Sequence, residues 1–162
     1  YACSGLMWLL GPKETGFLYI RRGFPSPVAP VFALYGFDAY TQSSGTRNVA
    51  LHMGLGAAID WHTQLGADNT SAYVMSLRDH CLQGLKQVPG IRIISPEDPK
   101  MSTGMVSFEL LRRKNSDVYA ALKERNIVVK VLPQHNAIRI SCHIFVARTE
   151  IDRLLFVLRG LT

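Results

Sequence analysis

The sequence is poor in cysteine and has no long apolar run. Its three cysteines, Cys3, Cys81 and Cys142, lie far apart and include no C-x-x-C pair. This pattern favours free thiols in a reducing compartment over a disulfide framework or a zinc site. No apolar stretch reaches the roughly 20 residues that a membrane-spanning helix requires. We therefore expect a cytoplasmic protein with no membrane partner.

The common signatures of phosphate-binding loops and hydrolytic sites are also missing. The chain has no G-x-G-x-x-G, no P-loop, no H-E-x-x-H and no G-x-S-x-G. None of its five histidines stands at metal-ligand spacing from another histidine or a cysteine. We expect no metal site, and no Ser/His/Asp constellation is indicated.

Apolar residues, by contrast, make up 48% of the 162 residues, enough for one compact domain, or for a small domain plus part of another. The net charge is +6, which suits nucleic acid or an anionic small molecule. The positive residues are scattered, with only short clusters at Arg21-Arg22 and Arg112-Arg113-Lys114, so a nucleic-acid partner is the weaker hypothesis. The chain opens at Tyr1 inside an apolar segment, and we expect it to be part of a longer protein.

The first half of the chain predicts one strand, one apolar loop and two helices. Thr15–Arg22 has the aromatic, weakly alternating pattern of a strand that leaves a Gly-Pro turn. Gly23–Ser44 is too apolar for a linker and is expected to pack on a second subunit. Asn48–Gln64 predicts a helix that is apolar on two faces, ended by Gly66 and buried on two sides. A second helix follows through about Gln87.

The second half has the order strand, strand, helix, strand, strand, helix. Strands that are grouped with helices able to cover one face indicate an α+β sandwich with a largely antiparallel sheet. The predicted strands are Ile91–Ser95, Met105–Leu111, Ile127–Leu132 and Ala137–Cys142, and the predicted helices are Ser116–Arg125 and a last helix capped by Thr149.

Two places predict ligand contacts. Ser44–Asn48 heads the doubly apolar helix, where free N–H groups and a hydroxyl make an anion site or an ordinary helix cap. Arg139 lies inside the otherwise apolar strand AIRISC. A buried arginine needs a carboxylate, which either a protein acid or a ligand can supply.

Three segments occur in an order that resembles a known family: SGLMWLLGPKETGFLYIRR, SGTRNVALHMGLGAAIDW and IRISCHIFVARTEIDRLL. Over essentially its whole length, the chain resembles the C-terminal portion of class V aminotransferases. These are fold-type-I pyridoxal-phosphate (PLP) proteins that include cysteine desulfurases and isopenicillin N epimerase-like enzymes. The resemblance implies an α+β small domain plus the last segment of a large α/β domain. It also implies a PLP cofactor, an amino-acid substrate and a homodimer.

The resemblance divides the chain into three parts. Residues 1–44 correspond to the tail of the large PLP-binding domain and a dimer-contact loop, residues 45–88 to connecting helices, and residues 89–162 to the α+β small domain.

The same resemblance assigns roles to residues. Ser4 aligns with a serine that helps hold the PLP phosphate, and Leu6 and Met7 stand where the family has a histidine and the Schiff-base lysine. Glu14 replaces a glycine that is common in the turn. Because methionine has no amine, residue 7 neither forms the covalent link nor moves the substrate's Cα proton.

Two further residues are assigned in this way. Thr46 aligns with the threonine that contacts the PLP phosphate of the neighbouring subunit, and Arg139 with the arginine that binds the substrate α-carboxylate. We therefore expect the C-terminal part of a PLP-dependent epimerase, desulfurase or transferase with impaired catalysis. The alternatives are a non-catalytic dimerisation or binding module and, less favoured, a basic nucleic-acid-binding domain.

Overall fold

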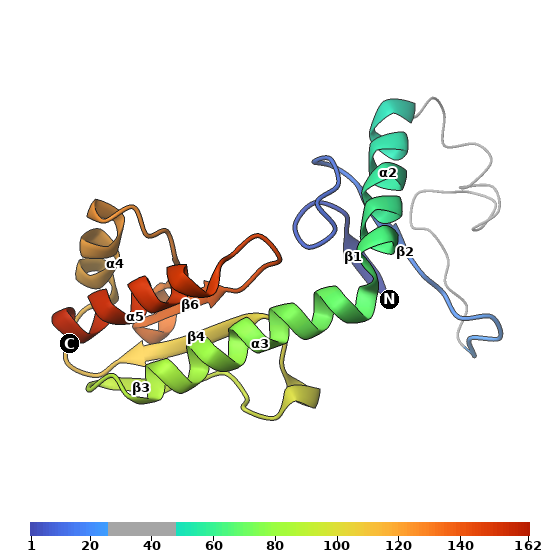
Figure 1. Cartoon of the computed structure of the whole chain (residues 1–162). Coiled ribbons are helices and arrows are strands. Elements are labelled where there is room, and N and C mark those ends of the chain that lie inside the picture. The colour runs from blue at the N-terminus through green and yellow to red at the C-terminus, as the bar shows by residue number, and fades with distance from the viewer. Residues whose placement is uncertain (26–47) are drawn as a thin grey trace. The chain divides into compact units, whose positions relative to one another are not determined.

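The computed structural model describes residues 1–25 and 48–162, which form two compact units, Tyr1–Gly66 and Ala67–Thr162 (Figure 1). Thr46 and most of the predicted loop Gly23–Ser44 lie outside the described residues. The assignment of 1–44, 45–88 and 89–162 to separate parts of a larger fold stays a prediction.

The first unit contains a short hairpin and one long helix. Strands β1 (Ala2–Ser4) and β2 (Gly16–Leu18) pair antiparallel, with Cys3 opposite Phe17. The predicted strand Thr15–Arg22 is thus shorter than expected, and β1 was not predicted. The ladder continues one pair beyond these bounds, where Tyr1 and Tyr19 exchange two backbone hydrogen bonds of 2.7 Å.

Helix α2 (Val49–Leu65) confirms the predicted helix. The Asn48 side chain caps it by accepting a hydrogen bond from the Leu51 N–H at 3.2 Å. Gly66 ends it with a φ of 83°, a conformation that glycine adopts without strain. The predicted burial on two sides is wrong for the described residues, because Leu55 alone is buried in α2 while Met53 is 71% exposed.

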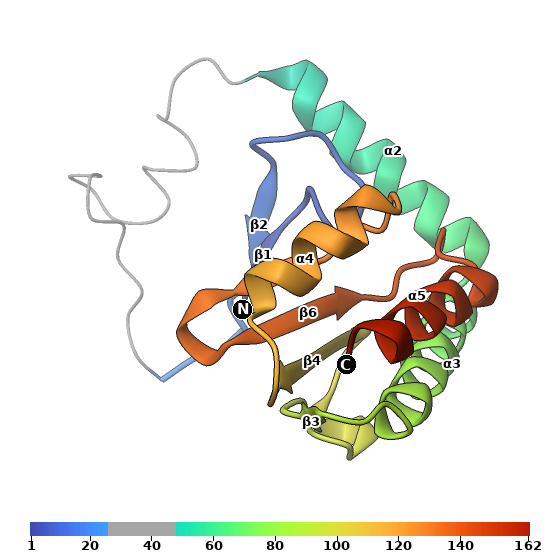
Figure 2. The same cartoon turned by 90° about the vertical axis from the view of Figure 1, so that its left-hand side faces the viewer.

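The second unit is a four-stranded antiparallel sheet with helices on one face, as the sequence predicted. The strand order is β3-β4-β6-β5, and Figure 2 shows β3, β4 and β6 side by side. The strands are β3 (Ile91–Ile93), β4 (Met105–Leu110), β5 (Lys130–Leu132) and β6 (Ala137–Ser141), and the helices are α3 (Ala67–Lys86), α4 (Asn115–Glu124) and α5 (Arg148–Leu161). This arrangement confirms the α+β class.

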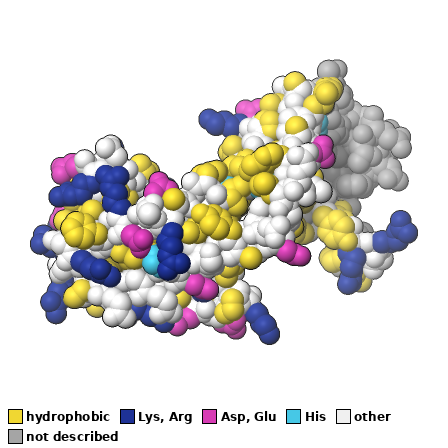
Figure 3. Space-filling view, in the orientation of Figure 1, with side chains coloured by type: hydrophobic (Ala, Val, Ile, Leu, Met, Phe, Trp, Pro, Cys, Tyr) yellow, Lys and Arg dark blue, Asp and Glu magenta, His cyan; other side chains and the backbone are white. Residues whose placement is uncertain are grey.

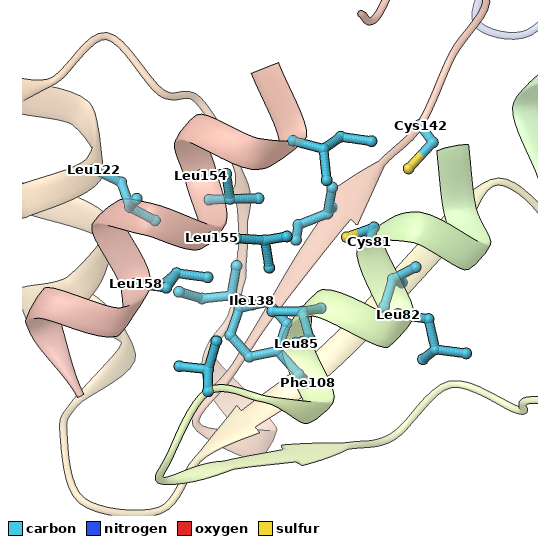
Figure 4. Close-up of a cluster of buried hydrophobic side chains, with 14 of the residues drawn as sticks. Cys81, Leu82, Leu85, Phe108, Leu122, Ile138, Cys142, Leu154, Leu155 and Leu158 are labelled. Atoms are coloured by element: carbon cyan, nitrogen blue, oxygen red, sulfur yellow. The ribbon is translucent and has the colours of Figure 1, made fainter. Parts of the chain in front are cut away.

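The hydrophobic core of the second unit lies between its sheet and its three helices. Alternate residues of β4 and β6 turn their side chains to the helices, and Phe108 and Ile138 are fully buried there. Leu85 from α3 and Leu158 from α5 close the same cluster (Figure 4). The intervening residues of β4 and β6, Arg139 among them, therefore point to the opposite face of the sheet.

Two predicted boundaries move. β5 begins at Lys130 instead of Ile127, because the Ile127 N–H donates to the Leu122 carbonyl at the end of α4 instead of to a strand. The last helix is capped at Ala147 rather than Thr149: the Ala147 N–H donates to the Glu150 carboxylate at 2.7 Å.

Two buried cysteines and a buried arginine complete the core. Cys81 and Cys142 are free thiols with no exposed surface, and Figure 4 places both beside the apolar cluster. The hydrogen bond to Cys142 and burial raise the pKa of Cys81 well above its ordinary range, while the hydrogen bond from Cys81 lowers the pKa of Cys142. Arg78 donates to the carbonyls of Pro96 and Glu97 at 2.7 and 2.9 Å, so its role is structural.

Candidate functional site

The loop that joins β1 to β2 is closed by backbone hydrogen bonds. The Gly5 N–H donates to the Thr15 carbonyl and the Gly11 N–H to the Gly5 carbonyl, both at 2.8 Å. The Thr15 hydroxyl donates to the Pro12 carbonyl at 2.6 Å. These bonds fix the ends of the segment that carries Leu6 and Met7.

Glycine is required where this loop packs on α2. A Cβ on Gly5 would lie 2.6 Å from the Thr15 hydroxyl and 2.8 Å from Leu55 Cδ1, and one on Gly11 would lie 2.9 Å from the same Leu55 atom. The Leu55 methyl and the Thr15 hydroxyl can shift, but a Cβ on Gly11 would also lie 2.8 Å from the Gly5 carbonyl oxygen, so a side chain at residue 11 would distort the loop itself. Close packing therefore accounts for Gly5 and Gly11 of the first motif.

The structure brings Ser4, Leu6 and Met7 into this one loop. Ser4 is exposed at the end of β1, and its hydroxyl oxygen accepts a hydrogen bond from the Leu6 N–H at 3.3 Å. Leu6 is 38% and Met7 64% exposed. Lys13 stands beyond Pro12, in the turn that Thr15 closes.

Arg139 lies on the central strand β6, on the sheet face opposite the helices. In register it stands between Ser107 of β4 and Lys130 of β5. Its Nε is buried without a hydrogen-bond partner, and within residues 1–25 and 48–162 it forms no ion pair. The described part of the chain therefore offers no protein carboxylate to Arg139.

The carboxylate nearest in register, that of Glu109, is bound by Arg92 through one of its two oxygens. Glu109 is two residues from Ser107 on β4 and shares its face of the sheet. Its Oε2 accepts a hydrogen bond from Arg92 Nε at 2.7 Å. Arg139 and Lys130 thus stand as cross-strand partners with no counter-charge among the described residues.

Lys130 is the charged neighbour of Arg139 that the sequence analysis did not single out. It is the single charged residue in the segment IVVKVL, just as Arg139 is in AIRISC, and that parallel was the available signal. Lys130 also lines an open depression of about 550 Å³ along β5, together with Tyr119 of α4 and the β5–β6 turn.

Other site types find little support in the described ranges. Residues 1–25 and 48–162 hold no group of three or more His, Cys, Asp or Glu side chains arranged for a metal ion. In the same ranges, no helix is both long and apolar enough to cross a bilayer.

A family model described as aminotransferase class-V matches residues 1–154. The match covers the β1–β2 loop, α2 and the strand with Arg139. The chain belongs to the class V aminotransferase family.

This class V chain is similar to isopenicillin N epimerase of Streptomyces clavuligerus, with 27% identity over all of this chain and 47% of that protein. Its fold matches the apo cysteine desulfurase of Thermococcus onnurineus with a TM-score of 0.81 and 24% identity, covering 99% of this chain and 46% of that one. It also matches a C-DES mutant with glycine covalently linked to the PLP cofactor, with a TM-score of 0.76 and 23% identity over 96% of this chain and 45% of that one. The chain spans about half the length of the curated relatives it matches.

The residues of this class V chain fit PLP only in part. Met7 carries no amine, so residue 7 does not fit a covalent attachment. The exposed Ser4 hydroxyl is a suitable hydrogen-bond donor for a phosphate oxygen. Thr46, the other residue assigned to the phosphate, lies outside the described residues.

Proposed function

We propose that this chain is the C-terminal part of a PLP-dependent class V protein that acts on an amino acid, and that its catalysis is impaired at residue 7. Ser4 and Thr46 contribute to the phosphate site, and Arg139 binds the α-carboxylate of the amino acid. Support comes from the family match over residues 1–154 and from the lack of a protein carboxylate beside Arg139 in the described residues.

The observation that carries this proposal is the placement of Met7. Residue 7 stands 64% exposed on a loop that Gly5 and Gly11 hold against Leu55. A lysine there would present its amine to a ligand, whereas the thioether neither bonds covalently to an aldehyde nor carries a proton.

The chain's own residues divide the work of substrate handling. Arg139 orients the amino acid, because a planar guanidinium on a central strand accepts a carboxylate in bidentate geometry. When bound, PLP supplies an electron sink for chemistry at the substrate Cα. Epimerisation, desulfuration and transamination all require a group that moves the Cα proton, and Met7 cannot do so.

Borohydride trapping tests the proposal. After incubation with PLP and reduction, peptide mass mapping of the wild-type chain is expected to show no lysine labelled above the background shared by the exposed lysines. The variant Met7→Lys is expected to carry its main adduct at residue 7, because that position is exposed and directly follows Leu6, whose N–H donates to the Ser4 hydroxyl.

A matched variant separates the alternatives. Lys13→Arg in the wild-type background leaves the labelling unchanged if Lys13 is only a surface residue. A wild-type adduct confined to Lys13 and lost in this variant would contradict the impaired site, and an unlabelled residue 7 in Met7→Lys would contradict the assignment of this loop to PLP.

The second candidate is a dimerisation module without catalysis. The exposed apolar residues of α2, Met53 and Val49 among them, favour it. We include in the proposal a homodimer and a cytoplasmic location, the latter supported by the free thiols of Cys3, Cys81 and Cys142.

Nucleic-acid binding is not favoured. On the face drawn in Figure 3, the Lys and Arg side chains of the described residues are interspersed with Asp and Glu. A nucleic-acid surface gathers its positive charge into a patch or a stripe.

A further inference from the structure

Lys130 and Arg139 form a pair of like charges in the sheet. They are direct partners in the antiparallel ladder of β5 and β6, and opposite residues of such a ladder project from the same face. Like charges in this arrangement destabilise a sheet. The unliganded fold therefore carries a local electrostatic cost that an anion on this face would remove.

The surrounding groups leave that pair open to a ligand. Glu109 Oε2 accepts hydrogen bonds from Arg92, and neither Lys130 nor Arg139 forms an ion pair with Glu109 or another acid within the described residues. Ser107, on the other side of Arg139, adds a neutral hydroxyl. The row Ser107, Arg139 and Lys130 thus offers two cationic groups and no anionic one.

One carboxylate occupies the fork of one arginine. Under the proposed function, Arg139 takes the α-carboxylate, so Lys130 remains available to a second negative charge. Lys130 sits on the edge strand as the direct cross-strand neighbour of Arg139, so its ammonium is placed beside a ligand that Arg139 holds.

We infer that the substrate class of this site is an amino acid with an acidic side chain, and that Lys130 is the residue that selects it. The inference rests on the proposed role of Arg139. Arg139 holds the α-carboxylate, and the ammonium of Lys130 pairs with the distal carboxylate from the neighbouring strand.

An NMR titration of the full chain with L-aspartate and L-asparagine tests this inference. The two probes have the same size and differ in the charge of the side-chain terminus. L-aspartate is expected to bind about fivefold more tightly than L-asparagine, the effect of one partly exposed ion pair. The preference should shrink at high salt, because salt screens an exposed pair.

Two matched variants identify the residue responsible. Lys130→Met is expected to abolish the preference, because it removes the ammonium that pairs with the distal carboxylate of L-aspartate. Lys123→Met removes the same charge from the exposed side of α4 and is expected to retain the preference. A preference that survives in Lys130→Met, or that is lost equally in Lys123→Met, would overturn the inference.

Two further arms distinguish this inference from the proposed function. Arg139→Gln is expected to weaken both probes; if neither is weakened, the proposed role of Arg139 fails. If Arg139→Gln weakens both probes while wild type shows no preference between them, only the role of Lys130 fails. Inorganic phosphate that binds the pair more tightly than L-aspartate would overturn the amino-acid assignment.

Discussion

Glu14 adopts a backbone conformation that side chains rarely take. Its φ is 65°, in the left-handed region, in the turn that follows Lys13. The family that the chain resembles commonly has a glycine at this position. The positive φ explains this preference, because glycine alone enters this region without a Cβ clash.

Glu14→Gly is therefore expected to raise the free energy of unfolding by about 0.5–1 kcal/mol. The substitution relieves the backbone strain at residue 14, and the greater conformational entropy of glycine in the unfolded chain offsets part of this gain. Urea denaturation followed by circular dichroism measures the change. The matched control is Lys13→Gly, since Lys13 is exposed and has no left-handed φ, and it is expected to destabilise. Equal effects of the two substitutions would contradict the role assigned to φ at residue 14.

The sequence predicted the strand that carries Arg139, because one charge stands out in the apolar segment AIRISC. The roles assigned to Ser4 and Met7 by the motif stay predictions. The sequence did not reveal that Lys130 is the cross-strand partner of Arg139. That pairing depends on the register of the β5–β6 hairpin, which is fixed by Asn136 in a left-handed conformation with a φ of 45°.

At the scale of the elements, α2 is the clearest departure from the sequence analysis. The helix itself was predicted to within one residue at each end, because its apolar period and Gly66 are local signals. Its burial was not predictable in this way, because burial depends on what covers each face. In the described residues the β1–β2 loop covers the side with Leu55, and Val49 and Met53 remain exposed.

If the exposed side of α2 forms part of a homodimer interface, a charge there will weaken the dimer. Met53→Glu is expected to raise the dimer dissociation constant at least about tenfold, since burying one methionine side chain contributes about 2 kcal/mol. Sedimentation equilibrium over a range of concentrations measures it. Gln64→Glu adds the same charge to an exposed position of the same helix and serves as the control. A wild-type chain that stays monomeric throughout would disprove the homodimer.

Short strands were the elements that sequence reasoning placed least well. β1 and β5 have three residues each. Three residues are too few for an alternation of apolar and polar side chains to be recognised in the sequence. β4 and β6, with six and five residues, alternate clearly and were predicted to within one residue.

At the scale of the whole molecule, the two units differ in how much apolar surface each buries. The buried cluster is drawn from α3, α4, α5, β4 and β6, all within Ala67–Thr162. In the described residues of Tyr1–Gly66, Leu55 is the one buried apolar side chain. Because burial of apolar surface is the main source of stability, the second unit should be the more stable of the two.

Hydrogen exchange measures this difference directly. Amides of β4, β6 and α3 are expected to exchange only on global opening of the second unit, while those of β1, β2 and α2 exchange through openings of lower free energy. Leu85→Ala, at a position with no exposed surface, should lower protection in the second unit by about 2–5 kcal/mol and leave α2 unchanged. A uniform loss of protection along the whole chain would mean that the two units unfold as one. The first unit would then not be a separately folding part, and its exposed apolar surface would not indicate that it needs a partner for stability.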